Sequence, residues 1–201
     1  MDVQHDKEAL FNEVYDTEHL PELNRLPGVS RISRYRTAVP HEPRYMVIYE
    51  IDHPDIPTSP AWKIAADKGR WAPQVRPYTL NRERHRAVCR WIGGKPGLLA
   101  TTPYLFLEAL DVEPDKGDLL NEVYERERVP ALARVAGVRN VIRYRADAEG
   151  HPAYLAILEI DAAGVPTSKA FVDAESQGRW NSAVLPYTYN RHLVLYERIG
   201  R

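Results

Sequence analysis

The spacing of apolar residues near the N-terminus predicts a helix. Leu10, Phe11 and Val14 are spaced to share one face of a helix over Phe11–Leu20. Proline lacks the backbone N–H that a helix interior needs, so Pro21 is expected to end or kink this helix. The chain therefore begins with one short amphipathic helix in this prediction.

The residues that follow change to the alternation typical of strands. Val29–Arg36 alternates in character, and Arg44–Asp52 is rich in β-branched and aromatic residues. Thr58 or Ser59 is expected to cap a second helix, because both can accept a hydrogen bond from its first turn. A last strand is expected over Arg86–Ile92.

The chain repeats itself with an offset of about 109 residues. The segment NEVYDTEHLPELNRLPGVSRISRYR from Asn12 aligns with NEVYERERVPALARVAGVRNVIRYR from Asn121, and close to half of all aligned pairs are identical. The match continues in four further pairs of segments: Tyr45–Asp52 and Tyr154–Asp161, Pro57–Ser59 and Pro166–Ser168, Gly69–Trp71 and Gly178–Trp180, Pro77–Arg82 and Pro186–Arg191. This period has the size of a small domain, so we expect a duplicated and fused domain of about 100 residues.

The second copy has one more element than the first. Tyr104–Val112 predicts a strand ahead of its first helix, which completes the order β-α-β-β-α-β of a ferredoxin-like fold. In the first copy only Asp2–Val3 matches the end of that strand, so the opening strand is expected to be missing there. The predicted fold class is α+β, with ferredoxin-like repeats at 1–93 and 103–201 and a linker at 94–102.

Apolar residues on both faces of a predicted strand indicate a second layer. Met46, Val47 and Ile48 are consecutive, so both faces of their sheet need cover. Two sheets packed face to face, as a dimeric α/β barrel fused in one chain, would provide it. Because the missing strand exposes an edge of the first sheet, we expect another chain, and hence a homodimer, or an element such as the linker to cover that edge.

Composition excludes several classes of protein. Lys and Arg number 27 against 28 Asp and Glu, so a general nucleic-acid binder is not expected. No apolar run is long enough to span a membrane, and the N-terminus does not resemble a signal peptide. Cys89 is the only cysteine, which excludes an intrachain disulfide. These features predict a cytoplasmic protein.

The element order and one motif resemble a known superfamily. The motif Tyr15-x-x-x-His19-x-Pro21 precedes a Pro-Gly turn and an Arg-Tyr-Arg strand, and it is similar to the EthD-like branch of the dimeric α+β barrel superfamily. That superfamily includes cofactor-free isomerases of muconolactones, polyketide cyclases, small monooxygenases and haem enzymes. The resemblance implies a site for an aromatic or lactone-like small molecule, with His19 in it. Fold alone constrains function weakly.

His19 is the first candidate for catalysis. Tyr15 lies four residues before it and shares its helix face, and a histidine of ordinary pKa suits general acid or base chemistry. The alternative is a helix-terminal histidine that caps carbonyls or lies in solvent. The second copy has Arg128 at the same position, and arginine cannot act as a base near neutral pH. The copies are therefore not equivalent, and Arg128 is expected to bind an anion or to be structural.

Arginine and tryptophan residues shared by both copies are candidates for substrate binding. Trp71 and Arg82 in the first copy match Trp180 and Arg191 in the second, and such pairs could bind an aromatic acid by stacking and paired hydrogen bonds. Because both copies keep them, we favour a structural role, in which the tryptophans fill the core. Arg82 and Arg191 would then pair with Glu18 and Glu127 respectively.

Carboxylates and tyrosines in the predicted strands complete the candidates. Glu50 is a possible catalytic acid or base, and Glu108 and Glu159 lie in similar apolar surroundings. The alternative for the strand carboxylates is an ion pair with Arg34 or Arg143 on the adjacent strand. Two tyrosines could line a pocket and contact substrate, or be packed in the core with the hydroxyl satisfied: Tyr35 and Tyr144.

Two functions follow from these residues. The first is a cofactor-independent enzyme of isomerase, lyase or cyclase type on an aromatic or lactone-like substrate, in which His19 moves a proton, Tyr15 orients it and Arg82 stabilises negative charge. The second is a non-catalytic barrel that binds a small ligand or acts in a stress response. The seven histidines show no metal-ligand spacing, so neither a metal nor another cofactor is expected, although the sequence leaves haem open.

Overall fold

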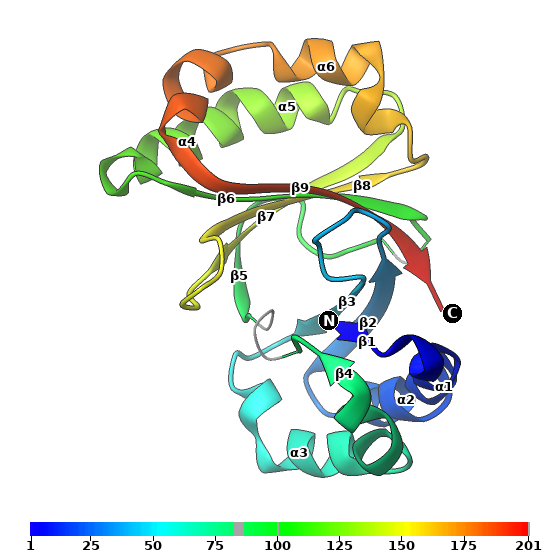
Figure 1. Cartoon of the computed structure of the whole chain (residues 1–201). Coiled ribbons are helices and arrows are strands. Elements are labelled where there is room, and N and C mark those ends of the chain that lie inside the picture. Colours follow the sequence, from blue (N-terminus) through cyan, green and yellow to red (C-terminus); the bar gives the residue numbers. More distant parts are fainter. Residues whose placement is uncertain (83–86, 100, 201) are drawn as a thin grey trace. The chain divides into compact units, whose positions relative to one another are not determined.

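The computed structural model describes residues 1–82, 87–99 and 101–200 of the chain (Figure 1). The chain forms two compact units. Unit 1 comprises Met1–Arg86 with Arg198–Arg201, and unit 2 comprises Ala87–Glu197. Both combine helices with antiparallel strands, so the predicted α+β class is confirmed.

Unit 2 contains a five-stranded antiparallel sheet. Its strand order is β9-β6-β8-β7-β5, with β5 at Cys89–Gly94, β6 at Tyr104–Val112, β7 at Val138–Ala146, β8 at Tyr154–Ile160 and β9 at Thr188–Ile199. Three helices cover one face of this sheet, α4 at Gly117–Val123, α5 at Val129–Leu132 and α6 at Lys169–Glu175 (Figure 1). From β6 onward the element order is the β-α-β-β-α-β arrangement predicted for the second copy.

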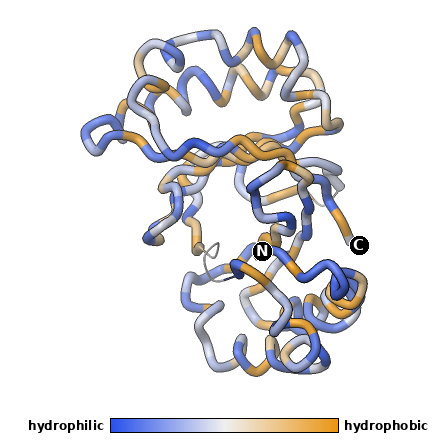
Figure 2. The backbone as a smooth tube through the Cα atoms, viewed as in Figure 1, coloured by the Kyte–Doolittle hydropathy of each residue, from blue (hydrophilic) through white to orange (hydrophobic). Residues whose placement is uncertain are grey.

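The core of unit 2 lies between the sheet and these helices. Leu110 and Leu158 from the strands pack with Leu120, Phe171 and Trp180 from the helical side. Strands β6 and β8 are rich in hydrophobic residues, and the middle of the unit 2 sheet is orange in Figure 2, as expected for a sheet that is covered by packing. Trp180 is therefore a core residue, as we favoured from the sequence.

Unit 1 is built from the counterparts of these elements. Its strands are β1 at Asp2–Val3, β2 at Val29–Arg36, β3 at Tyr45–Ile51 and β4 at Thr79–Leu80, and its helices are α1 at Glu8–Val14, α2 at Leu20–Asn24 and α3 at Pro60–Asp67. β2 and β3 form an antiparallel hairpin. The Ser59 hydroxyl accepts a hydrogen bond from the backbone N–H of Trp62 and so caps α3, as predicted. Trp71 is buried in the core of this unit with Phe11 and Tyr45.

The first helix of each copy contains one wider turn. A π-helical segment, Tyr15–His19, joins α1 to α2, and the segment Tyr124–Arg128 joins α4 to α5. Of the two outcomes expected at Pro21, an end or a kink of the helix, the end is not observed, because the helical path continues to Asn24. Pro21 lies in the first turn of α2, directly after the π segment, where a missing backbone N–H is tolerated.

The opening strand of unit 1 is short. Asp2 and Val3 in β1 pair with Leu80 and Thr79 in β4, and Met1 exchanges backbone hydrogen bonds with Tyr45 at the start of β3. Beyond Tyr45, no strand within the described parts of the chain pairs with β3 on the side away from β2. The linker therefore does not cover this edge as a strand, and cover by a second chain stays a prediction.

The C-terminal end of each copy belongs to the unit of the other copy. β5, at the end of the first copy, pairs with β7 in unit 2. It approaches so closely that a side chain at Gly93 would clash with Glu125. Arg198, at the end of the second copy, donates hydrogen bonds to the hydroxyls of Ser33 and Tyr35 in unit 1. The compact units thus differ from the boundaries 1–93 and 103–201 that the repeat predicts. The expected strand at Arg86–Ile92 is β5, and Arg86 itself lies outside the described residues.

Among the helices of the described residues, none has both the length and the apolar character that crossing a bilayer requires.

Candidate functional site

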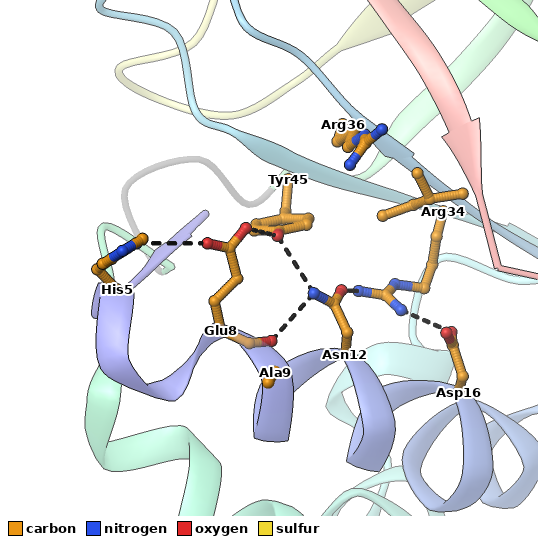
Figure 3. A pocket seen from close by; sticks show the side chains of 9 residues that line it. His5, Glu8, Ala9, Asn12, Asp16, Arg34, Arg36 and Tyr45 are labelled. Atoms are coloured by element: carbon orange, nitrogen blue, oxygen red, sulfur yellow. Dashed lines mark hydrogen bonds and ion pairs between the residues drawn. The ribbon is translucent and has the colours of Figure 1, made fainter.

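Unit 1 has a pocket of about 520 Å³ beside α1 and the β2–β3 hairpin (Figure 3). Arg34 lies at its base, where the guanidinium donates to Asp16 at 2.6 Å and to Asn12 at 2.7 Å. At the other side Glu8 accepts a hydrogen bond from the Tyr45 hydroxyl. These polar groups bond one another, and neither Tyr15 nor His19 lines the pocket.

The arginine at the base of this pocket has an equivalent in unit 2. Arg143 donates to Glu125 at 2.9 Å and to Asn121 at 2.7 Å, in the same pattern as Arg34 with Asp16 and Asn12. Because both units contain this network, it is part of the framework that joins the first helix to the second strand.

The sequence candidates of the first copy meet on the helical side of unit 1. His19 is only 5% exposed, and its ring stacks on Trp71 with centroids 4.5 Å apart and planes at 27°. Tyr15 presents an edge to both rings, at 4.9 Å from His19 and 4.8 Å from Trp71. The helix spacing therefore places Tyr15 beside His19, as predicted, and Trp71 forms the wall behind them.

The charge state of His19 differs from the expectation. Burial, followed by the positive charges of Arg76 and Arg82, lowers the pKa of His19 to about 3, and Asp67 opposes this shift weakly. The imidazole is therefore neutral near pH 7, and as a free base it is weaker than the ordinary histidine assumed from the sequence. Its Nδ1 atom is buried without a hydrogen-bond partner among the described residues.

Tyr15 is held in its protonated form. Burial raises the pKa of Tyr15 to about 12, although a hydrogen bond with Tyr49 and the charges of Arg34 and Arg82 act in the opposite direction. Arg82 thus acts electrostatically on both Tyr15 and His19. The group can supply a neutral imidazole, a phenol O–H and positive charge at one buried location.

Unit 2 has a buried ionic cluster at the equivalent place. Arg128 is 3% exposed and donates to Glu108 at 3.0 Å and to Glu175 at 2.6 Å, while its guanidinium lies 4.3 Å from the ring of Trp180. Tyr124 donates to Glu108 at 2.5 Å. Arg128 thus binds both carboxylates through Nη2, while its Nε and Nη1 are buried without a hydrogen-bond partner among the described residues.

Glu108 is the centre of this cluster. Burial alone would raise the pKa of Glu108, but Arg128 and Arg191 together bring it below its ordinary value, so the carboxylate is ionised. Arg191 donates to it through Nε at 2.8 Å. The expected pairing of Arg191 with Glu127 is wrong, because Glu127 binds Arg179 instead. The sequence lacked a signal for this, since Glu108 and Arg191 are distant in the chain and meet only because β6 pairs with β9.

Glu18 in unit 1 is bound by Arg70 in the same way as Glu127 in unit 2 is bound by Arg179. Glu18 accepts hydrogen bonds from the backbone N–H of Arg70 and from its guanidinium, at 2.8 and 2.6 Å. The partner of Glu18 is therefore Arg70, and the predicted pairing of Glu18 with Arg82 is wrong.

Other candidates lie away from His19. Glu50 forms an ion pair with Arg31 at 3.5 Å on the neighbouring strand, and its position on β3 alternates with those of Val47 and Tyr49, so it faces away from the helices. Tyr35 receives its hydrogen bond from Arg198. The structure therefore does not bring Glu50 or Tyr35 to the histidine.

The remaining strand candidates of unit 2 are also placed elsewhere. Glu159 accepts from Asn140 at 3.0 Å and from the backbone N–H of Leu99 at 2.7 Å, rather than from Arg143. Tyr144 pairs with Trp91 across the β5–β7 ladder and is half-buried. Neither residue contributes to the ionic cluster at Arg128.

Arg76 and Asp67 act on His19 but were missed from the sequence. They form an ion pair with each other, and Arg76 also donates to the backbone carbonyl of Ala66. A position-by-position comparison of the two copies holds the missing signal, because the second copy has Leu185 in place of Arg76 and Glu175 in place of Ala66.

The described residues include no group of three or more His, Cys, Asp or Glu side chains placed to hold a metal ion. Burial, with a smaller effect of Asp147, raises the pKa of the Cys89 thiol to about 11. Cys89 therefore stays protonated near pH 7 and is not an activated nucleophile.

Comparisons with known proteins reveal a shared fold. No family model and no curated protein matches the sequence. Two solved structures carry the name "putative monooxygenase". One, from Fusobacterium nucleatum subsp. nucleatum, is 13% identical with a TM-score of 0.68, over 98% of this chain and 88% of the other. The second, from Lactobacillus acidophilus, is 8% identical with a TM-score of 0.56, over 98% and 90%.

A third solved structure is an anthrone oxidase-like protein. It is 12% identical with a TM-score of 0.57, over 99% of this chain and 88% of the other. The likeness is one of fold. It is consistent with the dimeric α+β barrel superfamily that the sequence resembles, and at these identities it assigns no activity.

Proposed function

We propose that unit 1 contains the active site of a small-molecule enzyme in which neutral His19 accepts a proton from the substrate. The observation that carries this proposal is the position of the imidazole. It is buried on Trp71 beside Tyr15, and its Nδ1 has no partner among the described residues. The equivalent Arg128 instead donates through Nη2 to Glu108 and Glu175 within unit 2.

The other groups have roles that follow from their charge. The Tyr15 hydroxyl is protonated and donates to the Met1 sulfur at 3.9 Å. Because a thioether is a weak acceptor, a substrate oxygen can replace it, while Arg82 favours negative charge nearby. Proton removal and return is sufficient for isomerase, lyase or cyclase chemistry without a cofactor. The low pKa of free His19 requires that substrate binding make the imidazole more basic, and an anionic substrate near Arg76 and Arg82 would do this.

Proton abstraction can be tested before the natural substrate is known. A panel of aromatic acids and lactones is incubated with the protein in D2O, and proton NMR follows the replacement of ligand C–H by C–D. We expect exchange with wild type and a loss of about 10²-fold or more in His19→Ala, the usual contribution of a general base. His53→Ala is the matched control, because His53 is exposed on a loop. Equal exchange rates in wild type and His19→Ala would remove His19 from the mechanism.

Two neighbours named as monooxygenases and one named as an oxidase-like protein favour a second candidate, oxidation by O2. An oxygen electrode on the same panel separates it from isomerisation, since only oxidation consumes O2. The third candidate is a non-catalytic ligand-binding or stress-response barrel. The retention of Trp71 and Trp180 in both units supports this scaffold function, which predicts binding without exchange or O2 uptake.

The finer expectations on ancestry and assembly remain part of this proposal. Tandem duplication within the EthD-like branch is supported by the equivalent networks of Arg34 and Arg143. The proposal also includes a face-to-face fused barrel and a homodimer through the open edge of β3. It further includes a cytoplasmic location and the absence of cofactor and nucleic-acid partners. Light scattering after size-exclusion chromatography tests the dimer, which predicts twice the mass of the chain.

A further inference from the structure

We propose that unit 1 binds the carboxylate of an aromatic ligand at the position where unit 2 holds its own Glu108. This inference rests on the proposed site at His19 and specifies the class of molecule that the site accepts. The two units supply the argument, because one shows the framework with a carboxylate bound to it and the other shows the framework without that carboxylate.

Unit 2 shows how the framework binds a carboxylate. One oxygen of Glu108 accepts from Tyr124 at 2.5 Å and from Arg128 at 3.0 Å, and the other accepts from Arg191 at 2.8 Å. Trp180 closes the cluster, since Arg128 stacks on it and Tyr124 meets its ring edge at 5.1 Å. Three donors and an aromatic wall thus hold one ionised carboxylate.

Unit 1 presents the equivalent side chains at the offset of 109 residues. Tyr15 stands for Tyr124, Arg82 for Arg191 and Trp71 for Trp180, while His19 replaces Arg128. Tyr15 meets Trp71 edge-on at 4.8 Å, like the pair in unit 2. The framework that holds Glu108 in unit 2 is therefore retained, apart from the change at the histidine and from the Met1 sulfur, a weak acceptor to which the Tyr15 hydroxyl donates at 3.9 Å.

The charges around this framework differ in a way that favours an anion. The charged groups that act on Tyr15 are Arg34 and Arg82, whereas Tyr124 is affected by Glu108 as well as by Arg128 and Arg143. Two arginines and one aspartate act on His19: Arg76, Arg82 and Asp67. The first copy has Ala66 where the second has Glu175, and Arg76 where the second has Leu185. It also has Asp67, which pairs with Arg76, where the second has Ser176. Asp67 thus compensates Arg76, and the charge of Arg82, the second arginine that acts on His19, favours a ligand carboxylate beside it.

Aromatic side chains beside the site favour a flat ligand body. Tyr49, which bonds Tyr15, meets the ring of Trp62 at 5.1 Å, and both are half-buried. Their counterparts in unit 2, Leu158 and Phe171, are fully buried beneath β6. Unit 1 thus leaves two aromatic rings partly accessible on the side of the site, and a ligand ring can pack on them.

The experiment uses benzoate as the probe, benzamide as its uncharged analogue and propionate as the equivalent of a glutamate side chain. Nitrogen-15 NMR of the His19 ring in the full chain reports each titration. We expect benzoate to perturb the ring, to raise the pKa of His19 and to bind at least about tenfold more tightly than benzamide, the usual effect of charged hydrogen bonds. Arg82→Gln should weaken benzoate binding by about the same factor.

Two further variants make the test specific. Arg36→Gln changes an exposed arginine at the separate pocket and should leave benzoate binding unchanged. His19→Arg recreates the donor of unit 2 and should keep benzoate binding, measured by calorimetry, while it abolishes proton exchange. The inference is overturned if benzoate and benzamide bind equally, if Arg82→Gln binds benzoate like wild type, or if none of the probes perturbs His19.

The outcomes also separate this inference from the proposed function. Carboxylate binding without proton exchange on any ligand of the panel would leave the anion site and remove the enzyme. Exchange on an uncharged lactone by a protein that does not bind benzoate would keep the enzyme and overturn the carboxylate site.

Discussion

The two units bury equivalent aromatic residues beside their first helix, but the charged groups around these residues differ. In unit 2, Arg128 forms a buried ion pair with Glu108, and Tyr124 donates a hydrogen bond to the same carboxylate. At the same location unit 1 has a neutral histidine stacked on Trp71. The rings are common to both units and the charges are not. The comparison teaches that the shared residues describe the scaffold, while the positions that differ are where a function would reside.

The strongest way to break the comparison is to remove the carboxylate of unit 2. Glu108→Gln leaves Arg128 and Arg191 without their shared anion, and breaking a buried pair of this kind typically costs about 3–5 kcal/mol. Urea unfolding measures the loss. Glu13→Gln, at an exposed pair with Arg70, is the control and should cost at most about 1 kcal/mol. Equal losses in the two variants would show that the cluster of unit 2 does not stabilise the fold.

The pH dependence of stability sharpens the comparison from the side of unit 1. The unfolded chain protonates His19 near its ordinary pKa of 6.5, whereas the folded chain does so only near 3. Between these values the unfolded state holds more protons, so the free energy of unfolding decreases as pH falls from about 6.5 to 3.

This single group contributes a slope of up to about 1.4 kcal/mol per pH unit in that window. His19→Gln, which does not titrate, should be less sensitive to pH, as measured by urea unfolding at several pH values. Identical pH slopes in the two proteins would contradict the buried neutral state of His19.

The smallest expected loss of stability comes from the serine helix caps, which both units share. Ser59 accepts from Trp62 N–H at 3.1 Å, and Ser168 accepts from Phe171 N–H at 3.2 Å. Replacing either serine by alanine should cost about 1 kcal/mol, and the two losses should be equal within error. Thermal unfolding of the two variants checks this. Clearly unequal losses would mean that equivalent positions are not energetically equivalent.

Local patterns in the sequence predicted the elements well. The strands Val29–Arg36 and Tyr104–Val112 have the bounds that alternation predicts, and Ser59 caps its helix because the cap depends on neighbouring residues. The burial of Trp71 and Trp180 was also expected, since both copies keep an aromatic residue there.

Contacts between segments that are distant in the chain could not be predicted from the sequence. The partner of Arg191 depends on the pairing of β6 with β9, which no local pattern specifies. The lowered pKa of His19 arises from burial and from Arg76, a residue in another segment that was not a candidate. Proximity in helical spacing could be predicted, but the electrostatic surroundings that decide the chemistry could not.

The contribution of each copy's C-terminal end to the unit of the other copy has a consequence for the order of folding. Arg198 bonds Ser33 across 165 residues of sequence, so unit 1 acquires its last contacts only when the C-terminal end of the chain is present. Contacts of such long range close slowly, because the loop entropy is lost before the contact is gained. During synthesis unit 1 therefore cannot complete its contacts until the second copy has been made. Cutting the chain at the linker would separate β5 from unit 2 and the Arg198 end of β9 from unit 1.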